Sequence, residues 1–171
     1  GHVMVALYAL KRLRLDWVWW LVSPQNPMKS TAETAAYDER LEQTAQMADH
    51  PRFRVTDLEA QIGSRNTAQT LAALAPALQR GKFVWLMGAD SFRDLHHWHD
   101  WTRIAETLPL AVLARPGYTI SALHSPAAIR YARNRLPLEQ LAELPGHRTP
   151  AWAFIPMPLL RESSTAIRAL N

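Results

Sequence analysis

The sequence predicts a single α/β domain, built on a mainly parallel sheet that carries helices on both faces. Three observations lead to this prediction. Apolar strand patterns alternate with helical patterns along the chain. The connections between them are short, as expected for right-handed crossovers between parallel strands. The chain has 171 residues, of which 48% are hydrophobic and 20% are charged, and this composition suits one globular domain with a substantial core.

The predicted helices carry apolar residues three and four positions apart. The first has Lys11 and Arg12 near its end, where positive charge is favourable. The pattern after residue 91 is interrupted near Asp100, and the pattern over 121–136 is weak. In chain order, the predicted helices span 3–13, about 33–48, about 67–79, 91–107, 121–136 and a last helix that opens at Ser163.

The predicted strands are short apolar runs rich in β-branched and aromatic residues. The clearest run is K-F-V-W-L-M-G-A at 82–89. Proline, glycine and polar residues bound these runs, and such residues end regular structure. In chain order, the predicted strands span 16–23, 53–59, 82–89, 108–117 with a turn at its end, and 151–157.

Polar segments follow four of these strands. They read V-S-P-Q-N-P-M-K after the first strand, G-A-D-S after the third, A-R-P-G after the fourth and S-S-T after the last. In open parallel sheets, ligands bind beyond the carboxyl ends of the strands, beside the N-termini of helices. We therefore expect these four segments to border one ligand site.

Three hydroxyl residues, Ser163, Ser164 and Thr165, precede the last predicted helix, and Arg168 follows one turn later. One hydroxyl is enough to cap a helix. Several hydroxyls, free N–H groups and a guanidinium can together bind an anion such as phosphate. The segment by itself favours a helix cap, whereas its agreement with the other polar segments at strand ends favours the anion site.

The composition excludes several classes of protein. Cysteine is absent, so thiolate catalysis, disulfides and cysteine metal sites are excluded. The 6 glycines form neither G-x-G-x-x-G nor G-x-x-x-x-G-K-[ST], so the chain is neither a standard dehydrogenase nor a P-loop NTPase. The net charge of +4 is compatible with small phosphate-bearing ligands. No apolar run reaches membrane-span length and no secretory leader is recognised, so we expect a cytoplasmic protein without a membrane partner.

Two motifs resemble a known family. S-S-T-A-I-R at 163–168 is similar to the S-S-T-x-[IL]-R signature of bacterial nucleotidyltransferases, and Gly1-His2 resembles the end of their H-x-G-H motif. The segments L-V-S-P-Q-N-P-M-K-S, V-T-D-L-E-A-Q-I-G-S-R-N-T-A-Q-T-L-A-A-L and F-V-W-L-M-G-A-D-S-F-R-D-L-H-H-W-H-D-W resemble one branch, nicotinate-nucleotide adenylyltransferase. The resemblance runs in register from Gly1 to Leu170.

This resemblance implies a Rossmann-like, doubly wound parallel sheet in a single domain. It implies adenylyl transfer from ATP to nicotinate mononucleotide, which gives nicotinate adenine dinucleotide and pyrophosphate in NAD biosynthesis. Mg²⁺ would be carried by the ATP phosphates, so we expect no metal site made by the protein. We expect no nucleic-acid partner, and a homo-oligomer stays open.

The resemblance also assigns the ATP site. His2 would donate to the α-phosphate, beside Gly1, and Arg168 would act with Ser163, Ser164 and Thr165 on the β- and γ-phosphates. His2 and Arg168 are thus the expected catalytic residues. Because one substrate attacks the other directly, catalysis would consist of positioning and charge neutralisation. Glu162 stands where the family usually has an apolar residue and adds negative charge near this site.

Four residues match the family's mononucleotide site. Trp98 would stack on the nicotinate ring, Thr67 would offer backbone groups to its carboxylate, Asp90 would bond a ribose hydroxyl and Lys29 would meet the phosphate. Simpler interpretations exist: core packing for Trp98, a helix N-cap for Asp90, and exposed surface residues for Lys29 and His2. Trp17, Trp19, Trp20 and Trp85 lie in strand patterns and are expected to pack in the core. Asn66 stands where the family usually has Tyr. The histidines of H-H-W-H, which are His96, His97 and His99, are interpreted as a solvent-exposed cluster at the rim of the site.

Members of the family carry a strand and a loop of the form G-G-S-F-N-P-x-H ahead of the Gly-His pair. Neither is found in these 171 residues, so the resemblance implies a sheet that is incomplete at its centre. Two alternatives remain open. The first is a related adenylyltransferase acting on nicotinamide mononucleotide or phosphopantetheine, although the segment after residue 88 argues against the pantetheine branch. The second is a catalytically inactive nucleotide- or RNA-binding module.

Overall fold

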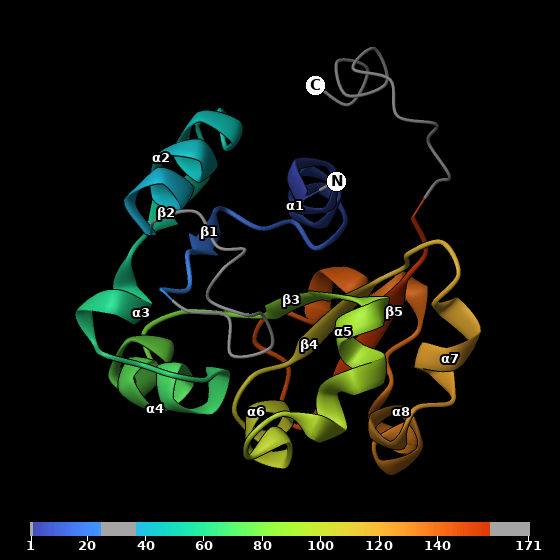
Figure 1. Ribbon diagram of the computed structural model, residues 1–171. Coiled ribbons are helices and arrows are strands. Elements are labelled where there is room, and N and C mark those ends of the chain that lie inside the picture. Colours follow the sequence, from blue (N-terminus) through green and yellow to red (C-terminus); the bar gives the residue numbers. More distant parts are fainter. Residues whose placement is uncertain (1, 25–36, 158–171) are drawn as a thin grey trace.

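The computed structural model describes residues 2–24 and 37–157 of the chain (Figure 1). Its helices are α1 His2–Arg12, α2 Tyr37–Met47, α3 Leu58–Gln61, α4 Thr67–Leu78, α5 Ala89–Asp94, α6 Trp101–Thr107, α7 Thr119–Leu123 and α8 Pro126–Arg130. Short 3₁₀ helices are η1 Leu95–His97, η2 Ala132–Asn134 and η3 Leu138–Glu143. The strands are β1 Val18–Leu21, β2 Phe53–Thr56, β3 Trp85–Gly88, β4 Leu110–Leu113 and β5 Trp152–Ile155.

All strand pairs among the described residues are parallel, as the alternating pattern predicts. β1 pairs with β2, and β3, β4 and β5 pair in that order. The register places Leu110 of β4 between Trp85 of β3 and Trp152 of β5. Within these residues the strands therefore form a two-stranded and a three-stranded sheet. Among the described residues, β1 and β3 are edge strands of these two sheets.

Helices cover both faces of the three-stranded sheet. On one face, Val112 and Phe154 pack in a cluster with Phe92 of α5 and Ile104 of α6. On the other face, Leu113 and Ile155 pack with residues of α1 and η3. Neighbouring residues of one strand point to opposite faces, so each apolar run serves two clusters. This arrangement confirms the doubly wound class.

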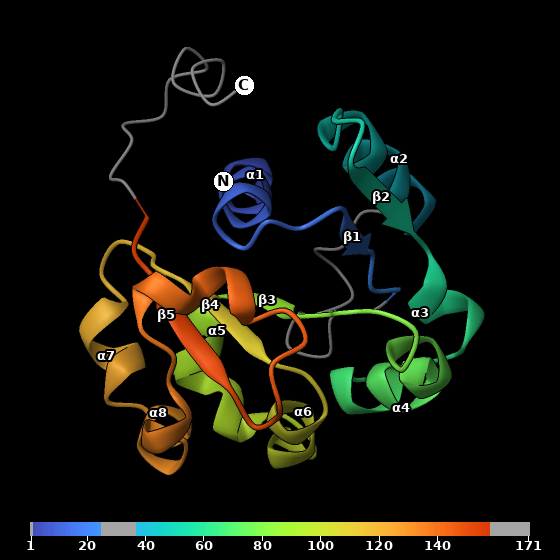
Figure 2. The same cartoon turned by 180° about the vertical axis from the view of Figure 1, so that it is seen from behind.

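Helix α1 joins the two sheets. Its Ala9, with Leu13 just after the helix, belongs to the cluster on the β3–β5 sheet, whereas its Ala6 and Leu10 pack with residues of β1 and β2. These four side chains are at most 4% exposed. Figure 2 shows α1 beside both groups of strands. Because Ala, with its small side chain, alternates with Leu along this helix, α1 approaches both sheets closely.

The structure corrects several predicted bounds. The pattern over 91–107 is α5, η1 and α6, and the interruption predicted near Asp100 is confirmed, since the φ of 47° at Asp100 lies in the left-handed region. The weak pattern at 121–136 is three short helices, because Ser125 and Pro126 start a new helix there. Sequence reasoning missed α3 and η3, which are too short for a periodic pattern. The last predicted helix, from Ser163, lies outside the described residues.

Candidate active site

The carboxyl ends of the strands carry polar residues, as expected. Ser23 follows β1, Asp57 follows β2, Asp90 follows β3 and Arg115 follows β4. His2 is the first residue of α1, and it is exposed.

Asp90 and Arg115 form an ion pair across the ends of β3 and β4. Arg115 Nη1 donates to Asp90 Oδ2 at 3.2 Å, and the side chains are 38% and 31% exposed. The other carboxylate oxygen, Asp90 Oδ1, is buried and has no hydrogen-bond partner among the described residues. An unpaired buried acceptor costs free energy until a donor reaches it. The carboxylate as a whole is partly exposed, so its accessible part can accept a hydrogen bond from a ligand, whereas Oδ1 is out of reach of solvent.

Gly88 allows this pair to form. A Cβ built at Gly88 would lie 2.9 Å from Arg115 Nε and would overlap Asp90 Oδ1. Any larger residue would therefore displace the carboxylate or the guanidinium. Gly88 is also the N-cap of α5, without a side-chain cap bond, so the interpretation of Asp90 as a helix N-cap is wrong.

Thr67 is the first residue of α4 and is half-buried. Asn66 caps this helix, because its side-chain oxygen accepts a hydrogen bond from the Gln69 N–H at 3.0 Å. The residue that replaces the family's Tyr therefore has a structural role. The first turn of α4 carries the backbone N–H groups that the resemblance assigns to a carboxylate ligand.

Trp98 ends η1 and is half-buried against the cluster that contains Phe92 and Leu95. The backbone N–H of Trp98 donates to Leu95 O at 2.9 Å, which holds the end of η1 in place. Ala68 of α4 belongs to the same cluster, so the structure brings the segments of Thr67 and Trp98 to one region. The packing interpretation accounts for part of the indole surface and leaves the rest for a ligand.

The other strand tryptophans do not all pack in the core. Trp17 and Trp19 are 47% and 50% exposed, because they lie on the face of β1 away from α1. Arg54 covers the Trp17 ring, with Cζ at 4.1 Å from the ring centroid. The expectation of core packing is thus wrong for these two.

The histidines do not converge on a metal site. His96 and His97 have ring centroids 3.8 Å apart, and His99 faces Asp100 at 3.4 Å. Among residues 2–24 and 37–157, no three His, Cys, Asp or Glu side chains are grouped to hold a metal. Beside them, a hydrogen bond from Arg93 holds the pKa of the Asp94 carboxyl below its usual value.

Helix α2, which the predicted helix at about 33–48 anticipates, holds the segment after β1 through contacts of Tyr37 and Arg40 that the sequence did not predict. Tyr37 donates to Val22 O at 3.2 Å, and Arg40 donates to Ser23 O at 2.9 Å and to Pro24 O at 2.7 Å. Tyr37 and Arg40 are three residues apart and share one face of the helix. Burial, followed by the charge of Asp57, raises the pKa of Tyr37. In the sequence, the three-residue spacing of Tyr37 and Arg40 is the feature that points to these contacts.

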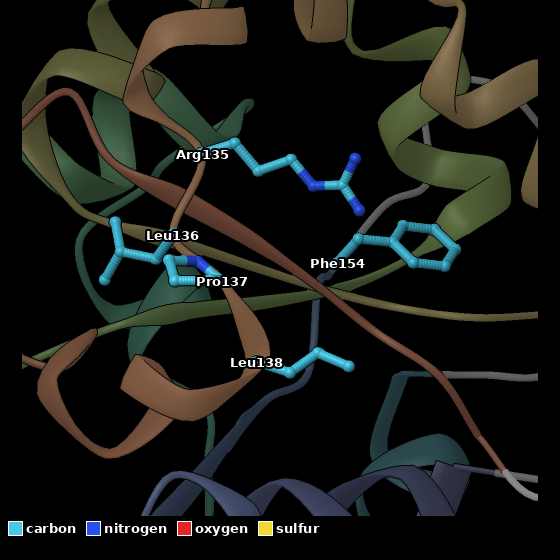
Figure 3. Close-up of a pocket in the computed structure, with 5 residues that line it drawn as sticks. All are labelled: Arg135, Leu136, Pro137, Leu138 and Phe154. Carbon is cyan, nitrogen blue, oxygen red and sulfur yellow. The ribbon is translucent and has the colours of Figure 1, made fainter.

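A separate hollow of about 310 Å³ lies beside β5 (Figure 3). Its lining includes Arg135, whose Cζ lies 6.0 Å from the ring centroid of Phe154. Arg135 also bridges to Trp152 of β5 at the sheet edge. None of the predicted site residues lines this hollow.

Several predicted site residues lie outside the described part of the chain, and their roles stay predictions. They are Gly1, Lys29, Ser163, Ser164, Thr165 and Arg168.

The sequence matches the cytidylyltransferase-like family over residues 1–170. This chain belongs to that family. None of the helices described is long and apolar enough to cross a membrane.

Relatives within this family share about half of the sequence. A protein of Ruegeria pomeroyi is 50% identical over 169 residues, which cover 99% of this chain and 79% of the relative. Proteins of Cereibacter sphaeroides and Parvibaculum lavamentivorans are 50% and 47% identical, over 99% and 98% of this chain and over 89% and 84% of theirs. All three are called probable nicotinate-nucleotide adenylyltransferase.

A solved structure supports the fold. Plasmodium falciparum nicotinic acid mononucleotide adenylyltransferase, complexed with APC, has a TM-score of 0.63 and 14% identity. The match covers 98% of this chain and 75% of that one. It confirms the nucleotidyltransferase fold that the sequence motifs predict for this member of the family.

Proposed function

We propose that this protein transfers the adenylyl group of ATP to nicotinate mononucleotide, forming nicotinate adenine dinucleotide and pyrophosphate. The names of relatives up to 50% identical support the reaction. The observation in the structure that carries it is Asp90, whose partly exposed carboxylate lies at the carboxyl end of β3 and pairs with Arg115. Such a carboxylate can accept a hydrogen bond from a ribose hydroxyl.

The mononucleotide would lie between β3 and α4. Asp90 would accept from its ribose, the first turn of α4 at Thr67 would receive the nicotinate carboxylate, and the exposed part of Trp98 would stack on the ring. The half-buried positions of Thr67 and Trp98 support these roles. Lys29 would meet the phosphate. Because the helix N-terminus favours an anion, this site would prefer the acid over the amide.

ATP would bind at the start of α1. A phosphate oxygen of the mononucleotide attacks the α-phosphorus in line, and the bond to pyrophosphate breaks. His2 would donate to the α-phosphate beside Gly1, and Ser163, Ser164, Thr165 and Arg168 would hold the leaving pyrophosphate. The exposed place of His2 at the start of α1 supports this role. ATP would enter with its divalent cation, for which we propose Mg²⁺.

Asp90→Asn tests the assignment. Losing a charged acceptor for the ribose should lower kcat/KM for nicotinate mononucleotide by about 10-fold or more. Asp94→Asn is the matched control, because Asp94 lies on the same helix and pairs with its neighbour Arg93. Steady-state kinetics and thermal unfolding of both variants give the readout. Equal kinetics for the two variants would remove Asp90 from the site.

A further inference from the structure

A buried carboxylate contacts α4, the helix whose first turn is assigned to the mononucleotide. Glu59 of α3 is only 9% exposed, although charged side chains are rarely buried without partners. Its Oε1 accepts a hydrogen bond from Thr70 Oγ1 at 2.9 Å, and Thr70 is fully buried. Taking a carboxylate out of water is costly unless donors compensate it. Burying the Glu59 carboxylate therefore costs free energy, which suggests that the pair with Thr70 has a function beyond packing.

The pair continues into a short chain of hydroxyls. Ser64 Oγ lies 2.6 Å from Thr70 Oγ1. Both hydroxyls also lie within hydrogen-bond distance of Asn66 O, at 3.1 Å from Ser64 Oγ and 3.2 Å from Thr70 Oγ1. The backbone N–H of Ser64 also donates to Glu59 O at 3.0 Å. These bonds tie α3, the connecting loop and α4 into one unit, and Figure 1 shows α3 beside α4.

This unit fixes the first turn of α4. Thr70 is one turn after Thr67, and its backbone N–H donates to Asn66 O at 3.1 Å. On its other side the helix is anchored by Ala68 and Leu71, which are 7% and 2% exposed. Apolar packing alone permits small rotations about the helix axis, whereas directed hydrogen bonds to a buried charge do not. The orientation of the Thr67 N–H group thus depends on Glu59 and Thr70.

We infer that Glu59 and Thr70 are positioning residues, which orient the first turn of α4 to receive the carboxylate of the mononucleotide. They act through Thr67 and do not touch the substrate. This inference rests on the proposed function, and it assigns the specificity for a carboxylate to a hydrogen-bonded pair behind the site. Small displacements of binding groups are costly, so the pair should matter for binding.

Thr70→Val tests the inference, because valine keeps the shape and removes the hydroxyl. KM for nicotinate mononucleotide should rise by about 10-fold, while KM for ATP stays within about 2-fold. Thr70→Ser keeps the hydroxyl and should restore the wild-type KM. The matched control is Thr107→Val, because Thr107 Oγ1 donates to Arg103 O of its own helix at 2.7 Å, outside this unit.

Other outcomes decide between the two proposals. A lower melting temperature of Thr70→Val with both KM values unchanged would make the pair merely structural and overturn the inference. If Thr70→Val does not fold, Glu59→Gln replaces it, since glutamine keeps the acceptor and loses the charge; unchanged KM values would again overturn the inference. If wild-type protein fails to bind nicotinate mononucleotide in calorimetry, the proposed function itself fails.

Discussion

At the scale of single residues, the site depends on one glycine as much as on charged groups. Gly88 gives room for the Asp90 and Arg115 side chains, which a Cβ would displace. Asp90 was predicted from its place after a strand, but the need for Gly88 was not, because it depends on Arg115, 27 positions along the chain. Such close approaches between distant segments leave no local sequence signal.

Trp98→Ala should weaken binding of nicotinate mononucleotide by about 1 to 3 kcal/mol, the range for an aromatic ring stacked on a base. ATP binding should barely change. Isothermal calorimetry with each ligand measures both, and Trp101→Ala is the matched control, because Trp101 is also partly buried against the same cluster. Equal loss of affinity for both ligands would make Trp98 a packing residue.

At the scale of elements, the strand edges differ in pairing. Val18 N donates to Arg52 O at 2.9 Å and Trp85 N donates to Pro109 O at 2.8 Å. In parallel strands the next residue points its N–H to the opposite edge, so Trp19 and Leu86 face the division between the sheets. No strand among residues 2–24 and 37–157 pairs with these two edges. β4, in contrast, is paired on both sides.

Amide hydrogen exchange should reveal this difference. In a chain of these 171 residues alone, the N–H groups of Trp19 and Leu86 should exchange on the order of 100-fold faster than that of Val112, in the central strand β4. NMR or mass spectrometry of the protein in deuterated buffer measures the rates. Protection of Leu86 as strong as that of Val112 would mean that another segment pairs with β3 and that the sheet is continuous.

At the scale of the whole molecule, the sequence predicted the layers better than the details. Alternating apolar runs, such as 82–89 and 151–157, indicated parallel strands covered on both faces, because each run buries both of its sides. The prediction that Trp17 and Trp19 pack in the core was wrong, because apolar character alone does not tell which face of a strand is covered. The Glu59 and Thr70 pair was missed, because burial of a carboxylate depends on tertiary packing.

The most direct test of the proposed function is product formation by the protein with ATP, Mg²⁺ and nicotinate mononucleotide. Mass spectrometry of the dinucleotide and a coupled assay for pyrophosphate follow the reaction, with nicotinamide mononucleotide in a parallel sample. We predict nicotinate adenine dinucleotide and pyrophosphate in equal amounts, with a higher kcat/KM for the acid than for the amide. A preference for the amide would indicate a related adenylyltransferase, and binding of ATP without any dinucleotide product would contradict the account.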